Sequence, residues 1–336
     1  MTSDKLGVAV VGAGYWGRKL IGEYLSLSGK RNDLELRCVA DCDRNRLASI
    51  ANEFHLRDNM VHAEPSEVLQ DSSVQAVHVA APNETHFKLG MQVLDARRHL
   101  LLEKPMAMTT REALKLARRA EEHSLVLQVG HIFRFNNAVK KAKSLLANDA
   151  VGKPLYLSME WNALFAAPAG RDIVFDLAPH PVDITNYLLD EWPTRVIAIG
   201  RSFVHEKTAG ERMAFVVTEF NHDILAQLSL SWIHHGPKTR RVIVTGESGT
   251  VEIDALDQRV TLYRGTTREN CRVQPNNTIE SEIGHFVDAI VRKGASENSA
   301  LIGAMNVAVL SAAKQSMKTG SYFDVLGRED TAKDQA

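Results

Sequence analysis

A glycine-rich turn near the amino terminus constrains the fold more than any other feature of this chain. The apolar residues 8–11 run directly into Gly12, Gly14 and Gly17, which are spaced as G-x-G-x-x-G. Such glycines allow a tight turn after a strand, a close approach of the main chain to a phosphate, and close packing of the next helix. That helix then presents free N–H groups and a positive dipole to an anion. The pattern predicts a strand, turn and helix that bind a dinucleotide, while a turn that serves only packing is the alternative.

Short apolar segments alternate with helical ones as far as about residue 130. We expect strands at residues 8–11, 35–41, 76–81, 99–103 and 126–130, and helices at 16–28 and 44–53 and from about 85 and 110. Alternation of this kind predicts a parallel sheet wound with helices on both faces. Thr109 and Glu112 have the spacing of a capping box, which supports the last of these helices.

The pattern changes after about residue 150. We expect strands at residues 154–162, 195–203, 213–221, 224–234, 240–245, 249–254 and 259–263, and helices at 281–292 and 301–318. Alternation with a period of two predicts a mostly antiparallel sheet with one buried face. The chain is therefore predicted to be an α/β protein with a dinucleotide-binding domain at 1–130, an α+β domain at 131–328 and a frayed tail at 329–336.

The composition argues against several classes of partner. The 336 residues include 40 basic and 41 acidic side chains, for a net charge of −1, so no basic surface indicates nucleic acid or an anionic membrane. No segment approaches the roughly 20 apolar residues of a membrane span. Three cysteines without a C-x-x-C pair, and a first strand that no signal-peptide pattern precedes, lead us to expect a reduced, cytoplasmic protein.

Two charged residues at strand ends are candidate binding residues. Asp41 ends the second expected strand, where a carboxylate binds the adenosine ribose and repels a 2′-phosphate. This predicts NAD, although Arg44 and Arg46 leave NADP open, and a cap for the next helix is the alternative role, which Asp43 could equally fill. Lys104 follows another expected strand, where ligands of open α/β sheets gather. A solvated lysine that only ends the strand is the alternative there.

Asp176, His180 and Asp183 form a second cluster. Spacings of four and three place them on one face if the segment is helical. Histidine exchanges a proton near neutral pH, and a carboxylate one turn away can orient it. A metal site with mixed nitrogen and oxygen ligands and a helix cap beside a hydrogen-bonded histidine are the alternatives.

Together these landmarks resemble the Gfo/Idh/MocA family of nicotinamide-dependent sugar and polyol oxidoreductases along nearly the whole chain. The matching residues are Gly12, Gly14, Tyr15, Trp16, Gly17, Asp41, Ala81, Asn83, His86, Glu103, Lys104, Pro105, His131, Arg134, Asn136, Asp176, His180, Asp183 and the segment 282–290. The resemblance implies a Rossmann domain followed by a domain with an open, mostly antiparallel sheet, which commonly stacks into homodimers or homotetramers.

The resemblance also implies a reaction, the interconversion of a secondary alcohol and a ketone by hydride exchange with the nicotinamide. His180 is then expected to take the hydroxyl proton, Lys104 to hydrogen-bond the reacting oxygen, and Asp176 to complete the catalytic set, with no metal. The implied cofactor-binding residues are Gly12, Gly14, Tyr15, Trp16, Gly17, Asp41, Ala81, Asn83, His86, Glu103 and Lys104, and the expected substrate contacts are His131, Arg134, Asn136, Arg171 and Asp183. The Lys104–Pro105 bond is expected to be cis, as in relatives.

Within the family, Tyr15, Trp16 and the segment 186–189 look most like the branch that oxidises nucleotide-linked sugars, often at C3 of a UDP-hexose or its uronate. The chain departs from the family pattern at Arg171 and Asp172, which replace a glycine-rich lead-in. Arg171 either meets a substrate phosphate or pairs with Asp172. An NAD-dependent glycoside hydrolase or lyase with transient oxidation, a dehydrogenase of free sugars or inositols, and a non-catalytic nicotinamide sensor are the competing functions.

Overall fold

The computed structural model describes residues 5–166, 171–203 and 210–325, which divide into two compact units. The first unit contains the residues up to Gly130 together with Ile279–Ala304, and the second contains His131–Thr278 and the residues from Met305 on. Residues 279–304, which the sequence pattern assigns to the second domain, therefore cluster with the first unit. The tail expected at 329–336 lies outside the described residues.

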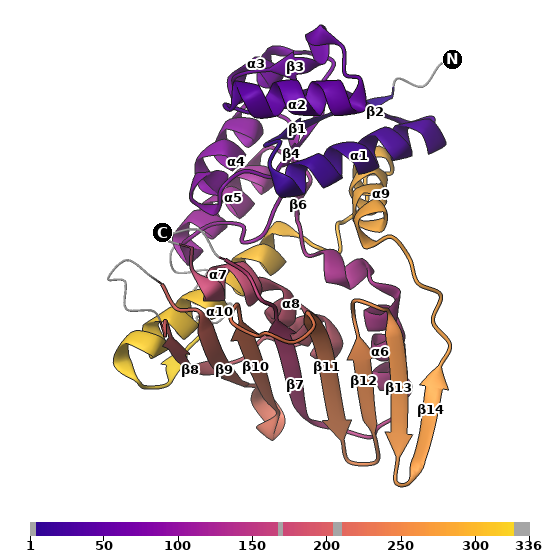
Figure 1. Cartoon of the computed structure of the whole chain (residues 1–336), viewed down its shortest axis with the longest axis vertical. Helices are drawn as coiled ribbons and strands as arrows, with labels where there is room; N and C mark the ends of the chain where they lie inside the picture. Colours follow the sequence, from indigo (N-terminus) through magenta and orange to yellow (C-terminus); the bar gives the residue numbers. More distant parts are fainter. Residues whose placement is uncertain (1–4, 167–170, 204–209, 326–336) are drawn as a thin grey trace. The chain divides into compact units, whose positions relative to one another are not determined.

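The described residues of the first unit form a six-stranded parallel sheet in the order β3-β2-β1-β4-β5-β6 (Figure 1). The strands are β1 (Leu6–Val11), β2 (Leu34–Ala40), β3 (Val61–His62), β4 (Ala76–Val79), β5 (His99–Leu102) and β6 (Leu127–Val129). All residues of the central strands β1 and β4 are buried, because helices cover both faces of such a sheet. This order is that of the doubly wound dinucleotide-binding fold, so the expected α/β architecture is confirmed.

Helices connect the strands of the first unit. They are α1 (Tyr15–Lys30), α2 (Arg44–Phe54), α3 (Pro65–Gln70), α4 (His86–Asp95) and α5 (Thr110–Glu122), with 3-10 turns at Asp58–Met60 and Asn83–Thr85. Thr109 caps α5, since its hydroxyl oxygen accepts the N–H of Glu112 at 3.2 Å. Strand β3 and helix α3 could not be predicted from the sequence, because elements of two and six residues carry too few apolar positions to show a period.

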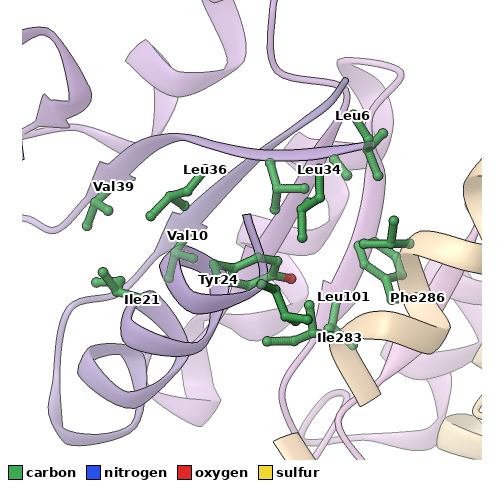
Figure 2. Packing of buried hydrophobic residues seen from close by; sticks show 14 of the residues in the cluster. Leu6, Val10, Ile21, Tyr24, Leu34, Leu36, Val39, Leu101, Ile283 and Phe286 are labelled. Atoms are coloured by element: carbon green, nitrogen blue, oxygen red, sulfur yellow. The ribbon is translucent and has the colours of Figure 1, made fainter. Parts of the chain in front are cut away.

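Helix α9 (Thr278–Val291) explains why a late segment of the chain belongs to the first unit. Ile283 and Phe286, three residues apart, lie on one face of the helix. Both are fully buried in the hydrophobic cluster of this unit (Figure 2). That cluster also includes Val10, Tyr24 and Leu101. Such packing joins residues more than 180 positions apart, so no local pattern could predict it.

The described residues of the second unit form a nine-stranded sheet in the order β14-β13-β12-β11-β7-β10-β9-β8-β15 (Figure 1). The strands are β7 (Pro154–Asn162), β8 (Arg195–Arg201), β9 (Met213–Glu219), β10 (Leu225–Ser231), β11 (Thr239–Gly246), β12 (Thr250–Asp254), β13 (Arg259–Arg264), β14 (Thr267–Cys271) and β15 (Phe323–Asp324). Neighbouring strands are antiparallel except β7 and β10, which are parallel. The expected open, mostly antiparallel sheet is confirmed.

The two faces of this sheet differ. The helices of the unit are α6 (Asn137–Ala147), α7 (Ile173–Leu177), α8 (Pro179–Leu189) and the part of α10 (Ala300–Thr319) from Met305 on, with 3-10 turns at Ile132–Phe135 and Asn221–Asp223. Helices α6, α7 and α8 pack on one face (Figure 1). The opposite face carries apolar side chains that are 44–56% exposed, namely Tyr156, Ile199, Phe215 and Leu225.

Candidate functional site

The glycine turn joins β1 to α1 in the first unit. A Cβ atom on Gly17 would lie 1.8 Å from the carbonyl oxygen of Gly12, and Gly12 itself has a φ of +99°. These two glycines are required by the fold of the unit. Gly14 differs, because a Cβ there would meet no atom of the described chain within 4 Å. Since Gly14 precedes α1 without a side-chain cap, the open space beside it and the N–H groups of the first helical turn fit a pyrophosphate.

The carboxylate of Asp41, directly after β2, lies against this turn. Its Oδ2 accepts the N–H of Ala13 at 2.7 Å, and Arg46 Nη1 donates to the same oxygen at 3.0 Å. Burial alone would raise the pKa of Asp41, but hydrogen bonds from the main chain of Asp43 and Ala13 and from Arg46 keep that pKa below its ordinary value. Asp43 is the N-cap of α2, so the capping role considered for Asp41 is wrong. Ribose binding by Asp41 stays a prediction.

Glu103 is a buried carboxylate at the end of β5. Trp16 Nε1, from the glycine turn, donates to its Oε1 at 2.5 Å, and His78 Nε2 lies 3.4 Å from the same oxygen. A Cβ on Gly130 would lie 2.8 Å from the Glu103 carboxylate, so the glycine makes room for it. Burial alone would raise the pKa of Glu103, but His78, Trp16 and the charge of Lys104 keep that pKa below its ordinary value. Glu103 therefore anchors the strand end from which Lys104 follows.

The side chain of His86 contacts two loops at the same edge of the sheet, the loop after β4 and the loop after β5. The Lys104–Pro105 peptide bond is cis, as expected. His86 Nδ1 lies 2.7 Å from the carbonyl oxygen of Pro105, and its Nε2 lies 2.9 Å from that of Ala81. Burial lowers the pKa of His86, which favours the neutral ring. The ring thus fixes the loop after β4, on which Asn83 is also located, relative to the loop after β5.

The structure brings the predicted cofactor-binding residues to one edge of the first sheet. Gly12, Gly14, Tyr15, Trp16 and Gly17 follow β1, Asp41 follows β2, Ala81, Asn83 and His86 follow β4, and Glu103 and Lys104 follow β5. Carboxyl ends of parallel strands meet at one edge, and ligands of such sheets bind there. Their individual contacts to a cofactor remain predictions. His78, which the sequence analysis did not single out, belongs to this group through Glu103.

Asp176 and His180 lie on two short helices of the second unit rather than on one. Asp176 belongs to α7 and His180 to α8, with Ala178 between the helices. Pro179 and Pro181 have no N–H to donate to the preceding turn, which explains the interruption. Asp176 is only 9% exposed, so its carboxylate is largely shielded from water within this unit.

Arg171 lies beside Asp176. Its Nη2 donates to Asp176 Oδ1 at 3.1 Å. Asp172 has other partners, because it caps α7 and forms an ion pair with Lys314 at 2.6 Å. The pairing of Arg171 with Asp172 that the sequence left open is therefore wrong. Contact of Arg171 with a substrate phosphate stays a prediction.

Other predicted substrate contacts are buried within the second unit. Arg134 Nε donates to Asp183 Oδ1 at 2.8 Å, and Arg134 Nη2 donates to the Asn186 side chain at 2.6 Å. Asn136 caps α6 and donates to the main chain, and His131 is 1% exposed. The observed contacts of Arg134, Asn136 and Asp183 stabilise the fold of the unit, and substrate binding by these residues remains a prediction.

Aromatic rings connect His180 with the sheet of the second unit. The Phe133 ring centroid is 5.0 Å from that of His180 and 5.3 Å from that of Trp161 on β7, both edge to face. The Trp161 ring also contacts Arg240 on β11, whose guanidinium lies 5.3 Å from the ring centroid. Neither Trp161 nor Arg240 was among the residues expected from the sequence. The sequence signal that could have indicated Arg240 is a charged residue at a position where the alternation of the strand predicts an inward-facing side chain.

The metal alternative finds no support in the part of the chain that the structure describes. There, no three side chains of His, Cys, Asp or Glu are grouped so that they could bind a metal ion. Asp183, one of the ligands considered, is paired with Arg134.

Two protein-family models match this chain and identify its family. A model described as "Oxidoreductase family, NAD-binding Rossmann fold" matches residues 6–131, and the model of the GFO/IDH/MocA C-terminal domain matches residues 139–252. The chain belongs to the Gfo/Idh/MocA family of oxidoreductases. Members of this family act on CH–OH groups of sugars and polyols with NAD(P), and the NAD-binding domain expected from the glycine turn is confirmed.

Individual relatives have different activities. The chain is 29% identical over 292 residues to UDP-N-acetylglucosamine 3-dehydrogenase of Acidithiobacillus ferrooxidans, which covers 84% of this chain and 87% of that protein. A solved structure of that enzyme superposes with a TM-score of 0.82 at 26% identity, covering 94% of this chain and 98% of the other. The chain is also 26% identical over 267 residues to 2,7-anhydro-N-acetylneuraminate hydratase of Mediterraneibacter gnavus, with 75% and 68% covered.

No helix within the described ranges is both long and apolar enough to cross a membrane.

Proposed function

We propose that this Gfo/Idh/MocA protein oxidises a secondary alcohol of a nucleotide-linked sugar to a ketone with NAD. The observation that carries the proposal is the placement of the buried Asp176 and the half-buried His180 on consecutive helices, with Arg171 on the carboxylate. The similarity to UDP-N-acetylglucosamine 3-dehydrogenase supports the substrate class.

Each of three residues has a role that its chemistry suits. When bound, NAD accepts a hydride from the carbon that carries the hydroxyl group. His180 accepts the hydroxyl proton, since an imidazole exchanges protons near neutral pH. The Lys104 ammonium donates a hydrogen bond to the reacting oxygen and stabilises the negative charge that develops on it. Asp176 stabilises the protonated imidazole.

Alanine variants of Lys104 and His180 test these roles. Each is expected to lower kcat about 100- to 10,000-fold, the range that general acid–base groups contribute, and for the His180 variant the Kd for NAD should stay within a factor of two. NADH formation at 340 nm with UDP-N-acetylglucosamine and with free sugars gives the rates. Lys115→Ala and His235→Ala, at exposed positions, are the matched controls. Full activity in either test variant would refute the assignment.

A second candidate follows from the hydratase among the relatives. Such a protein would oxidise its substrate transiently and reduce it again, with a bond made or broken in between. Product analysis separates the two: net accumulation of NADH supports the dehydrogenase, and a changed substrate with no net NADH supports the alternative.

We also propose that the exposed sheet face joins two copies of the chain. The register places Tyr156 opposite Leu225 and Phe215 opposite Ile199, so these side chains lie on one face. An apolar face spread over four neighbouring strands suits a second copy of the same face. Light scattering is expected to give at least a dimer for the native chain and a smaller particle for Phe215→Glu, whereas an unchanged mass for the variant would contradict this interface.

A further inference from the structure

Arg240 is a buried cation in the second unit without a carboxylate partner among the described residues. The side chain is on β11, in register with Trp161 of β7, and only 9% of the residue is exposed. Its Nη1 donates to the carbonyl oxygens of Asn162 at 3.3 Å and Thr239 at 2.6 Å. Burial lowers the pKa of Arg240 to about 10, while the nearby charge of Asp176 acts in the opposite direction.

These contacts use only part of what the guanidinium offers. A guanidinium carries five N–H donors in a planar fork, and the hydrogen bonds within the described chain come from Nη1 alone. Removing a charge from water is unfavourable unless the charge is paired and its donors are used. The contact with the Trp161 ring compensates for a part of that cost. Donors therefore remain for a group that the chain itself does not supply.

The charges around Arg240 do not balance. Arg171 is paired with Asp176 at 3.1 Å, and Asp176 is also the acidic group whose charge acts on Arg240. Asp176 thus acts on both guanidinium groups, but its ion pair is with Arg171, so the positive charge of Arg240 has no ion-pair partner among the described residues. Lys314 does not change this balance, since it has Asp172 and Glu211 as partners of its own.

A hydrogen-bond acceptor near Arg240 has no donor within the described part of the chain. The side chain of Asn162, at the end of β7, is 9% exposed, and its Oδ1 is buried without a hydrogen-bond partner in the described part of the chain. Its main-chain oxygen is the one that Arg240 contacts. Through Trp161 and Phe133 the same side of the sheet packs against His180. Arg240 therefore belongs to the surroundings of the proposed catalytic histidine.

We propose that Arg240 binds an anionic group of the substrate, either a sugar carboxylate or the phosphates of a nucleoside diphosphate. This rests on the proposed function, because it names the feature by which that substrate is recognised. The planar fork suits both anions, since carboxylate and phosphate oxygens accept two parallel N–H bonds. Arg240 is a specificity residue in this assignment, and the proton and hydride steps do not depend on it.

Calorimetric titration of the NAD-loaded protein tests the assignment with four probes: UDP-N-acetylglucosamine, UDP, glucuronate and uncharged N-acetylglucosamine. The native chain is expected to bind at least one charged probe more tightly than N-acetylglucosamine, and UDP against glucuronate tells which anion is recognised. Arg240→Met is expected to weaken that probe about tenfold or more, in line with the loss of charge-assisted hydrogen bonds. Its Kd for NAD and for N-acetylglucosamine should not change.

Arg241→Met is the matched control. Arg241 is the next residue of the same strand, it points to the opposite face, and it pairs with Glu252. This variant should bind all probes as the native chain does. Arg240→Lys, which retains the charge but not the fork, is expected to recover part of the lost affinity.

Thermal unfolding separates substrate recognition from a purely structural role. Replacing a buried cation that has no carboxylate partner by methionine is expected to leave Tm unchanged or raise it. A lower Tm with equal weakening of charged and uncharged probes would overturn the proposal, as would a native chain that prefers the uncharged probe. The proposed function is judged separately, because NADH formation from UDP-N-acetylglucosamine would support it even where Arg240→Met binds the charged probes as the native chain does.

Discussion

The acidic side chains of the two units have different surroundings. In the first unit, Asp41 and Glu103 receive hydrogen bonds from the main chain, an indole and one arginine of the same unit, and these contacts outweigh burial in setting their pKa values. In the second, Asp176 forms an ion pair with Arg171, and its charge also acts on the buried Arg240. These two carboxylates of the first unit thus have their hydrogen-bond donors within that unit, whereas Arg240 of the second unit retains a positive charge and unused donors. This difference supports the proposal that Arg240 meets an anionic group of the substrate.

The largest loss of stability is expected when the buried ion pair of Arg134 and Asp183 in the second unit is broken. Asp183→Ala leaves the Arg134 guanidinium buried without its carboxylate, so the free energy of unfolding should fall by about 3–5 kcal/mol. Urea unfolding followed by circular dichroism measures it. Glu219→Ala removes the partly exposed pair with Arg195 and is the control, with an expected loss of about 1 kcal/mol or less.

The opposite result would change the comparison. If Asp183→Ala is as stable as Glu219→Ala but raises KM for the sugar, then Asp183 binds substrate, and the polar interior of the second unit serves recognition rather than folding.

The first unit could be predicted from the sequence in more detail than the second, for a physical reason. Its strands and helices alternate locally, and Gly12, Gly14, Asp41 and Lys104 are located directly at strand ends. Each of these positions can be inferred from its neighbours in the chain. The second unit has contacts between residues far apart in sequence, such as Arg134 with Asp183 and Arg240 with Trp161. No period or spacing encodes which inward-facing side chains of different strands meet.

Two further features could not be predicted from the sequence, the strand β14 and the unit to which helix α9 belongs. The edge strand β14 is polar along its whole length, with no apolar alternation to reveal it. Helix α9 was predicted, but its membership of the first unit depends on the burial of Ile283 and Phe286 in a core made by the first 101 residues. Only the packed structure shows that contact.

Two glycines in the turn of the first unit are expected to differ in what they contribute, one to NAD binding and the other also to stability. Gly14→Ala adds a methyl group where the described chain has no atom within 4 Å, so Tm should not change, while the Kd for NAD should rise about tenfold or more because the phosphates lose their close approach. Gly17→Ala places a Cβ 1.8 Å from a main-chain oxygen and should cost about 1–3 kcal/mol of stability in addition.

Gly29→Ala, in the same helix with open space around it, is the control for both variants. Fluorescence titration with NAD and thermal unfolding are the two measurements. A Gly14 variant that binds NAD as the native chain does would remove the strongest structural argument for where the pyrophosphate binds.

The smallest effect is expected from the charge of Asp41, and its pH dependence tests whether the first unit balances that charge itself. The hydrogen bonds to Asp41 keep its pKa in the folded protein below the ordinary value of about 3.9. The charged carboxylate therefore contributes stability that is fully present above that value and is lost as the pH falls through the lower pKa of the folded state. Asp41→Asn should cost about 1–2 kcal/mol at pH 7, and the difference in Tm between variant and native chain should shrink below about pH 4. Asp58→Asn, at an exposed position, should show no such difference at either pH. A Tm difference for Asp41→Asn that is the same at pH 7 and at pH 3.5 would mean that Asp41 acts through its shape and hydrogen bonds, and that the two units do not differ in how they balance charge.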